Sequence, residues 1–447
     1  MQIKKMAATV LALLVPAAFT WAQKQWTLDE CLDYALANNL QLKQGQITKE
    51  QNAAALEQQK AAFFPTLSFS TNQNASWRPW NQSFVNLTGG TLTSTSSEVN
   101  YNGSYGLNAG WTVWNGGRNQ KNIDKSKVAY EQSDYEWEQT ANSIQEQIAQ
   151  YFVQIMYQTE AVKVNQQILE ASKLQRDRAK TMVEVGNLAR VDLSQLEAQV
   201  SQDEYNVVSA QTQLENYKLQ LKQLLELVGT ESFDICIPDI DDNNILAPIP
   251  SKQEVFEAAL SSRPEIQSGR LNIKSSELDI DIAKRGYYPT LSMSAGIGTS
   301  NTSGIHTDLS QQWKNNLNNS LGLTLSIPIL DNKQNRTNVR RAKLSKESSE
   351  LSLKTAEKEL YSQIEAYWLN ANSSQHQYTA ARANVASMQE SYDLVSEQFR
   401  LGLKNIVELT TGKNNLLQAQ QQLLQSKYVA LLNVAMLRFY KGERIRL

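Results

Sequence analysis

The fold is decided by a short glycine-centred stretch, Met182-Val183-Glu184-Val185-Gly186-Asn187-Leu188-Ala189-Arg190-Val191-Asp192-Leu193, which separates two very long segments of apolar periodicity. A second copy follows 216 residues later as Phe399-Arg400-Leu401-Gly402-Leu403-Lys404-Asn405-Ile406-Val407-Glu408-Leu409. In both copies the glycine follows a branched apolar residue, and a carboxylate stands six residues after it. A helix that ends at a glycine and restarts behind a few polar residues is typical of an αα-hairpin. The sequence therefore predicts two long helical hairpins with glycine tips.

Apolar residues repeat every seven positions along the arms of these hairpins. The arm after the first tip carries them at Val200, Val207, Leu214, Leu221 and Val228, and Asp203 alone interrupts its companion seam. The last arm has the same spacing at Leu409, Leu416, Leu423, Ala430 and Leu437. Sustained spacing of this kind predicts coiled-coil pairing, with the polar positions in water.

The chain is a tandem duplication. Pro65-Thr66-Leu67-Ser68 recurs as Pro289-Thr290-Leu291-Ser292 at an offset of 224, whereas Gly106-Leu107 and Gly322-Leu323 are offset by 216. A change of eight residues belongs in a surface loop. We therefore expect one repeat over residues 23–228 and another over 251–447, joined by a linker at 229–250 that contains three prolines.

Each repeat is expected to run helix, strand, loop, strand and helical hairpin. The first repeat begins with a helix from Leu28 to about Phe63, opened by a capping box of Thr27 and Glu30. Its strands are expected at about 66–77 and 101–114, and its hairpin at about 117–228. The second repeat has a helix from Ser251 to about Tyr287, with an interruption near Pro264, strands at about 290–300 and 319–330, and a hairpin at about 332–440. All four strands alternate apolar residues with small or polar ones, the pattern of a half-buried strand.

Residues 1–22 have the pattern of a secretory signal peptide. Lys4 and Lys5 precede an apolar run over residues 6–19, and Thr20-Trp21-Ala22 makes a cleavage site before Gln23. A membrane anchor is the alternative, but the apolar run is short for a span. No run of eighteen apolar residues follows, so a membrane-spanning part would have to be a β-barrel. The net charge of −2 lacks the basic excess of a nucleic-acid partner.

Four strands are too few to close a barrel, which needs about eight or more. Two or three copies would supply eight or twelve strands, and three suit a water-filled lumen better. The polar face would then line a channel, and the apolar face would meet lipid. We expect an aromatic belt from the tryptophans at or near the strand ends, with ordinary core packing as the alternative: Trp77, Trp80, Trp111, Trp114 and Trp313.

The chain resembles the TolC-like outer-membrane efflux protein family over everything after the signal peptide. The resemblance rests on the Pro-Thr-Leu motifs at 65–67 and 289–291, the Val-Gly and Leu-Gly tips at 185–186 and 401–402, and the strand exits at 111–117 and 327–331. It implies an α+β membrane protein that combines a tandem-duplicated β-barrel with long coiled-coil hairpins. It further implies a homotrimer with a twelve-stranded barrel in the outer membrane of a Gram-negative cell and a twelve-helix periplasmic tunnel.

The same resemblance implies a function and partners. The function is the exit channel of a tripartite efflux system, and the partners are a periplasmic adaptor (membrane fusion) protein, an inner-membrane RND or ABC transporter and outer-membrane lipid. The exit duct of a type I protein secretion system stays open as an alternative. A secreted coiled-coil structural protein is a further alternative, but it gives no reason for four alternating strands.

The family's periplasmic gate maps onto the hairpin tips. By position, Asp192 and Glu408 correspond to acidic gate residues, and Phe399 and Lys404 to an aromatic and a basic residue of the closing network. The adaptor-contacting tips correspond to Val185, Gly186, Leu401 and Gly402. Thr411 stands where the family can have a second acid. Carboxylates repeated around a pore repel one another and need cations such as Lys404 or Arg190 to hold it shut. Solvated helix-end charges and simple glycine turns are the alternatives.

No pattern of catalytic, cofactor or metal chemistry stands out. His306 and His376 have no ligand set around them, and the chain has neither a glycine-rich phosphate loop nor an evident nucleophile and base. We therefore expect no enzyme activity and no cofactor. Cys31 and Cys236 form neither a disulfide framework nor a zinc pattern, so one bridge and two separate thiols both remain open.

Overall fold

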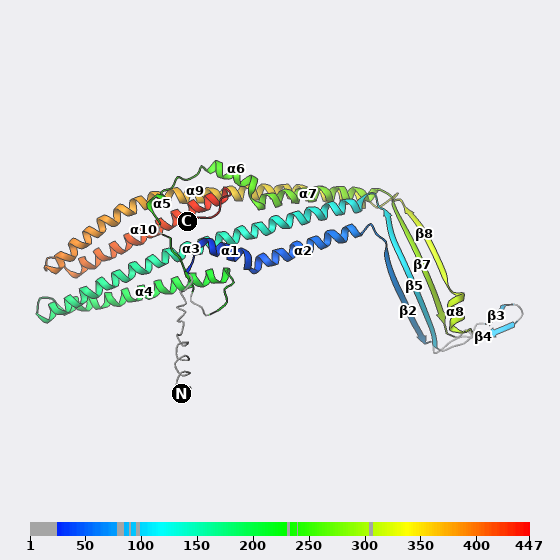
Figure 1. Cartoon of the computed structure of the whole chain (residues 1–447), viewed down its shortest axis with the longest axis horizontal. Helices are drawn as coiled ribbons and strands as arrows, with labels where there is room; N and C mark the ends of the chain where they lie inside the picture. The colour runs from blue at the N-terminus through cyan, green and yellow to red at the C-terminus, as the bar shows by residue number, and fades with distance from the viewer. Residues whose placement is uncertain are drawn as a thin grey trace, which may run out of the picture. The chain divides into compact units, whose positions relative to one another are not determined.

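A computed structural model describes residues 25–77, 85–88, 91–94, 99–229, 233–238, 240–303 and 307–447. The expected signal peptide, Trp80 and His306 lie outside these residues. Figure 1 follows the chain from α1 in blue to α10 in red. The short elements are β1 (Gln25–Trp26), α1 (Leu28–Asn38), β3 (Val85–Thr88), β4 (Thr91–Ser94), β6 (Asp234–Ile235), α5 (Asp242–Ile245), α6 (Lys252–Ser262), the 3₁₀ turn η1 (Arg285–Tyr287) and α8 (Leu309–Asn315). The long ones are α2 (Leu40–Ala61), β2 (Thr66–Trp77), β5 (Val99–Trp114), α3 (Arg118–Glu184), α4 (Arg190–Leu224), α7 (Pro264–Lys284), β7 (Thr290–Thr302), β8 (Asn318–Ser326), α9 (Gln334–Arg400) and α10 (Ile406–Tyr440).

The chain folds into two compact units, and each unit takes segments from both sequence repeats. The helical unit comprises the chain up to Gln44, then Glu138–Arg263 and Lys358–Leu447. The sheet unit comprises Gly45–Trp137 and Pro264–Glu357. The repeats are therefore interleaved in space, because matching helices and strands from the two halves lie side by side.

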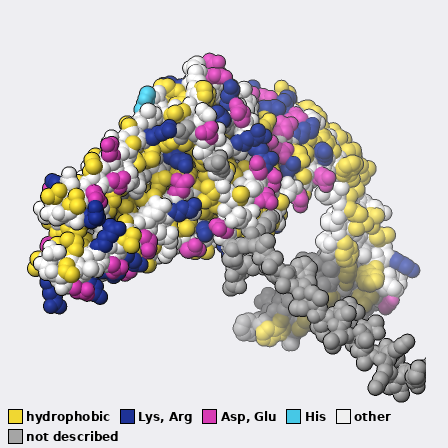
Figure 2. Space-filling model, turned by 60° about the vertical axis from the view of Figure 1, so that its left-hand side comes forward, with side chains coloured by type: hydrophobic (Ala, Val, Ile, Leu, Met, Phe, Trp, Pro, Cys, Tyr) yellow, Lys and Arg dark blue, Asp and Glu magenta, His cyan; other side chains and the backbone are white. Residues whose placement is uncertain are grey.

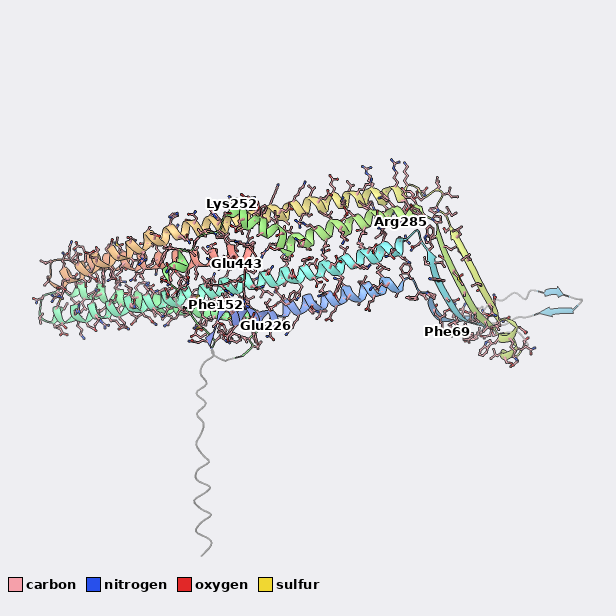
Figure 3. The ribbon with its side chains drawn as sticks, turned by 45° about the horizontal axis from the view of Figure 1, so that its top comes forward. Phe69, Phe152, Glu226, Lys252, Arg285 and Glu443 are labelled. Atoms are coloured by element: carbon pink, nitrogen blue, oxygen red, sulfur yellow. The ribbon has the colours of Figure 1, made fainter. Side chains whose placement is uncertain are left out.

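The sheet unit contains one antiparallel sheet in the order β2-β5-β7-β8. The pairing of β5 with β7 joins the two repeats, with Ala109 opposite Ala295. Because side chains alternate along a strand, this register collects apolar residues on one face and Ser, Asn, Thr and Gly on the other. Phe69 on the apolar face is 67% exposed, whereas Phe152, a core residue on α3, is 1% exposed (Figure 3). The part of the strands visible in Figure 2 is mostly apolar and uncharged.

The strands begin where the alternation begins, but the last one stops early. The strand expected over 319–330 ends at Ser326, so Ile327 and Ile329 stand outside it. Pro328 explains the difference, because proline has no N–H for a strand ladder. The loops between the strands carry elements that the sequence did not indicate, the hairpin β3–β4 and the helix α8.

The first helix of each repeat is broken. The capping box of Thr27 and Glu30 is present, but Asn39 leaves the helical conformation and divides the expected 28–63 helix into α1 and α2. The Asn39 side chain accepts a hydrogen bond from the Gln41 N–H at 2.8 Å and donates one to the Leu224 carbonyl at 2.9 Å. In the second repeat α7 starts at Pro264, a position that proline favours because the first turn of a helix needs no N–H partner.

The helical unit contains both hairpin tips, all of α4 and α10, and the parts of α3 and α9 from Glu138 and Lys358 onward. Its core is built from the apolar seam positions of these helices, among them Ile148, Phe152, Leu221 and Leu437. The linker adds a parallel pairing of β6 with β1 that the sequence did not indicate, and the Cys236 N–H donates to the Trp26 carbonyl at 2.9 Å. Cys31 is buried and Cys236 partly buried, and no disulfide joins them. Among the described residues, no helix has the length and apolar character that crossing a membrane requires.

Candidate functional site

Both hairpins turn at their tips through the same backbone motif. The N–H groups of Gly186 and Asn187 donate to the carbonyls of Val183 and Met182, at 3.0 and 2.8 Å. At the second tip, Gly402 and Leu403 donate to Phe399 and Gln398, at 3.0 and 2.9 Å. The glycines have φ values of +77° and +73°, in the left-handed region that disfavours other residues. These are Schellman turns, which close the last carbonyls of a helix.

The two tips differ where the next helix begins. α4 follows Ala189, which offers no side-chain cap. α10 follows Asn405, whose side chain accepts a hydrogen bond from the Glu408 N–H at 2.9 Å, while the Glu408 carboxylate accepts one from the Asn405 N–H at 3.2 Å. This reciprocal capping box satisfies two backbone donors through side chains, whereas at the start of α4 the Asp192 N–H donates to the Ala189 carbonyl at 3.1 Å and no side chain caps the helix.

Lys404 and Glu408, both expected in the gate, form an ion pair at the second tip. The hydrogen bond from Lys404, followed by that from the Asn405 N–H, holds the pKa of Glu408 below its usual value. Asp192, the corresponding acid of the first tip, is partly buried in the first turn of α4. Within the described part of the chain, no ion pair to Asp192 is formed.

Phe399 lies inside the protein, away from the surface of the tip. It is 8% exposed and belongs to an apolar cluster shared by both hairpins. The cluster joins Ala179 and Leu196 of the first hairpin to Tyr392, Ile406, Leu409 and Leu416 of the second. Thr411, which lies one turn after Glu408 on α10, is exposed. Within one chain, the structure therefore gives Phe399 a packing role that ties the two tips together.

Both tips also present uncovered apolar side chains. Val185 and Leu401, which precede the two glycines, are 64% and 58% exposed. Leu403 and Val407 add to the second tip, and Val191 adds to the first. A cluster of exposed apolar residues beside charged ones is typical of a protein contact surface.

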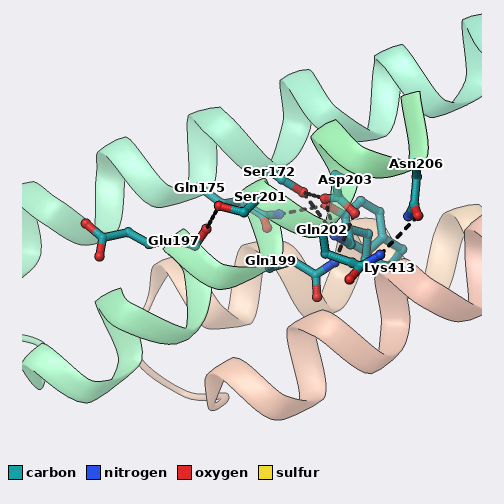
Figure 4. Close-up of polar contacts among 10 residues, drawn as sticks. Ser172, Gln175, Glu197, Gln199, Ser201, Gln202, Asp203, Asn206 and Lys413 are labelled. Atoms are coloured by element: carbon teal, nitrogen blue, oxygen red, sulfur yellow. Dashed lines mark hydrogen bonds and ion pairs between the residues drawn. The ribbon is translucent and has the colours of Figure 1, made fainter. Parts of the chain in front are cut away.

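The structure reveals a buried polar cluster that sequence reasoning missed (Figure 4). Lys413 of α10 lies 2.6 Å from Asp203 of α4 and donates to the Ser172 hydroxyl of α3 at 3.0 Å. Burial lowers the pKa of Lys413, and Asp203 opposes that shift. The sequence held a signal, because Asp203 interrupts an apolar seam and Lys413 lies between Leu409 and Leu416 of another.

Four of the five tryptophans expected in the aromatic belt are described, and they lie at both ends of the sheet. Trp77 ends β2, and Trp313 of α8 meets the Tyr105 ring edge-on at 5.7 Å. At the other end Trp114 meets Tyr288 edge-on at 6.5 Å, and the Trp111 indole donates to the Phe63 carbonyl at 2.8 Å. All four are at least 39% exposed, so none is an ordinary core residue in this chain.

No metal-binding arrangement was found among the described residues, where no three or more His, Cys, Asp and Glu side chains gather closely enough to hold an ion.

Comparison with known proteins returns one consistent group. A family model described as outer membrane efflux protein matches residues 31–226 and 255–443. Outer membrane protein TolC of Salmonella enteritidis is 23% identical over 304 residues, which cover 66% of this chain and 60% of that protein. Alkaline protease secretion protein AprF of Pseudomonas aeruginosa is 23% identical over 261 residues, which cover 58% and 53%. The match thus spans less than two thirds of either relative.

Among solved structures, the CmeC outer membrane channel of Campylobacter jejuni superposes with a TM-score of 0.74 at 21% identity. The superposition covers 94% of this chain and 87% of that one. At this level of identity the likeness establishes the fold.

Proposed function

From the premise that the chain belongs to the outer membrane efflux protein family and is an outer-membrane protein, we propose that it is the exit channel of a tripartite efflux system. It conducts, without chemistry of its own, substrates that an inner-membrane RND or ABC transporter delivers through a periplasmic adaptor. The fold, which solved outer membrane channels share, supports this role over an enzyme.

One observation carries the proposal: the sheet has an apolar face, an uncharged polar face and two open edges. In β2 the polar face consists of Thr66, Ser68, Ser70, Asn72, Asn74 and Ser76, and in β8 of Asn318, Ser320, Gly322, Thr324 and Ser326. The edges β2 and β8 have no partner in the described chain, and open edges in lipid leave costly unpaired backbone groups. Three copies close the edges into twelve strands around a polar lumen. Trp77, Trp111, Trp114 and Trp313 then stand at the two membrane interfaces.

The hairpin tips form the periplasmic gate of this channel. Asp192 and Glu408, repeated around the threefold axis, form rings of carboxylates, and Lys404 offsets the charge of Glu408. Phe399 stabilises the closed tip from within. The exposed Val185, Gly186, Leu401 and Gly402 make the contact with the adaptor.

Export of proteins is the second candidate, because the relative AprF is named for secretion of an alkaline protease. An exit duct of a type I secretion system has the same barrel and tunnel, and the pump selects the cargo. Identification of the adaptor and pump that co-purify with the chain separates the two functions.

Channel formation is tested with purified protein in planar bilayers and with outer-membrane fractions. We expect heat-modifiable trimers and a small resting conductance that rises several-fold when Asp192→Asn and Glu408→Gln are combined, because the acid rings no longer attract the cations that close them. Glu170→Gln, an exposed charge well away from the tips, is the matched control. A monomer in the outer membrane would refute the barrel, and unchanged conductance would refute the gate.

A further inference from the structure

The strand β7 extends beyond its partner β8, and the helix α8 is its neighbour there. The pairing of β7 with β8 ends at Gly298, opposite Asn318, whereas β7 itself continues to Thr302. α8 lies beside this last part of β7, at the end of the sheet away from α7 (Figure 1). The backbone groups on this side of β7 therefore need partners other than β8.

Two polar side chains of the α8 segment supply these partners. The Gln312 side chain accepts a hydrogen bond from the Thr302 N–H at 2.9 Å and donates one to the Thr307 carbonyl at 2.9 Å. Asn316, which follows α8, donates to the Ser300 carbonyl at 2.7 Å. Gln312 is 6% exposed, so its bonds are made away from water, where an unpaired backbone group is costly. Polar side chains thus hold α8 to the strand.

The large apolar side chains of α8 are left uncovered. Leu309 and Trp313, four residues apart on one side of the helix, are 55% and 47% exposed. The Trp313 ring meets Tyr105 edge-on, and the Trp313 carbonyl accepts a hydrogen bond from the Thr299 hydroxyl at 2.8 Å. Tyr105 and Thr299 are opposite each other in the register, on the face that also carries Leu107. α8 therefore extends the apolar face of the sheet.

This arrangement is the reverse of what water favours. A helix in water normally covers its apolar side chains and exposes its amides, whereas α8 buries Gln312 and exposes Leu309 and Trp313. At the boundary between acyl chains and headgroups the preference changes, because apolar side chains enter the lipid, tryptophan is enriched, and backbone groups need partners within the protein. The exposed charges of Asp308 and Lys314 would remain in the headgroup layer.

A second copy of the chain is the other candidate to cover these side chains. Copies that close a barrel meet at the edges of the sheet, β2 and β8. Trp313 instead contacts Tyr105 of β5, a central strand. Continuity with the apolar face of the sheet therefore favours lipid over a second copy.

We propose that α8 is an interfacial helix whose Leu309 and Trp313 enter the outer leaflet at the boundary between acyl chains and headgroups. Gln312 and Asn316 are the positioning residues that hold it there. The proposal rests on the barrel of the proposed function, because the apolar face of that barrel places α8 against lipid. The partner is the hydrocarbon of the lipid and its boundary with the headgroups.

The test measures how close a label on α8 comes to lipid. An environment-sensitive fluorophore is attached at Leu309→Cys after Cys31 and Cys236 are replaced by alanine. Trimers are reconstituted into phosphatidylcholine vesicles that contain brominated lipid, whose bromine atoms quench a fluorophore that they contact. Gln311→Cys, an exposed position on the other side of the same helix, is the matched control. Leu321→Cys, 74% exposed on the apolar face of β8, reports on the barrel itself.

With bromine near the headgroup end of the acyl chain, we expect quenching at position 309 to be at least about threefold stronger than at 311. Gln312→Ala removes side-chain bonds that attach α8 and is expected to lower this ratio at least about twofold. Ser310→Ala removes a bond that stays within the α8 segment, from the Ser310 hydroxyl to Asp308, and is expected to leave the ratio unchanged.

Equal quenching at positions 309 and 311 would overturn the proposal. The colour of the emission then identifies the cause, since a fluorophore in water emits to the red and one covered by a second copy emits to the blue without quenching. An unchanged ratio in Gln312→Ala, or an equal fall in Ser310→Ala, would overturn the positioning role. If Gln312→Ala forms no trimers, Asn316→Ala replaces it, and an unchanged ratio there has the same meaning.

The label at position 321 separates this inference from the proposed function. Quenching at 321 without excess quenching at 309 refutes the interfacial helix and leaves the barrel standing. No quenching at 321 counts against the barrel, and the ratio between 309 and 311 in the same vesicles still decides whether α8 contacts lipid.

Discussion

The two hairpin tips share one turn and differ in the side chains that hold it. Position by position, Phe399 at the second tip corresponds to Val183 at the first, Ile406 to Arg190, and Lys413 to Glu197. The three residues of the second tip are buried, whereas Arg190 and Glu197 are exposed and Val183 is only partly covered. Duplication has kept the Schellman glycine and changed its anchors. At these positions the second tip is therefore anchored by buried side chains, whereas the first tip reaches the shared cluster through the partly buried Leu188 and Leu193.

The largest expected difference lies in the apolar anchors. Phe399→Ala removes a buried ring from the shared cluster and is expected to cost about 3–5 kcal/mol of local stability. Val183→Ala, the matched change at the first tip, is expected to cost about 1 kcal/mol or less, because its side chain is only partly buried. Amide hydrogen exchange over residues 395–410 and 179–194 measures both. Equal losses at the two tips would remove the distinction between a firmly and a weakly anchored tip.

Part of this asymmetry was visible in the sequence, and part was not. The repeated glycines predicted both turns, and the alternation from Thr66 predicted β2 to its last residue, because a local pattern decides these features. The apolar period predicted one continuous helix through Asn39. The helix breaks there because the Asn39 side chain donates a hydrogen bond to the Leu224 carbonyl, 185 residues away. Periodicity contains no information about such a partner.

The candidate site divides in the same way. Lys404 and Glu408 are four residues apart around the start of α10, so their contact follows from their spacing in the sequence. Asp203 stood out in its apolar seam, but its partner lies on another hairpin, 210 residues later. Which seam residue of α10 faces Asp203 depends on the register between hairpins, and only the folded chain provides it.

The helix caps are expected to produce the next largest effect. A cap can be removed from α10 or added to α4, which reverses the difference between the two tips. Asn405→Ala removes the capping box of α10 and is expected to cost about 1 kcal/mol. Ala189→Asn supplies the cap that α4 lacks and is expected to gain a similar amount. Protection of the first-turn amides of α10 and α4 against hydrogen exchange reports each change. If Ala189→Asn brings no added protection, the missing side-chain cap of α4 is not what weakens the first tip.

The smallest expected effect is a difference between the two tips, which carry Glu408 and Asp192, in how their stability depends on pH. The hydrogen bonds from Lys404 and from the Asn405 N–H hold the pKa of Glu408 below its usual value, so the folded tip favours the charged carboxylate. A carboxyl group with a lowered pKa contributes stability that is present above its ordinary pKa of 4.5 and is lost as the pH falls through the lowered value. Exchange at the second tip, corrected for its intrinsic pH dependence, should therefore increase relative to the first tip as the pH falls below that range. Lys404→Met keeps the length of the side chain without its charge and should reduce this difference. If it leaves the difference unchanged, the Asn405 cap and not the ion pair sets the response of Glu408 to acid.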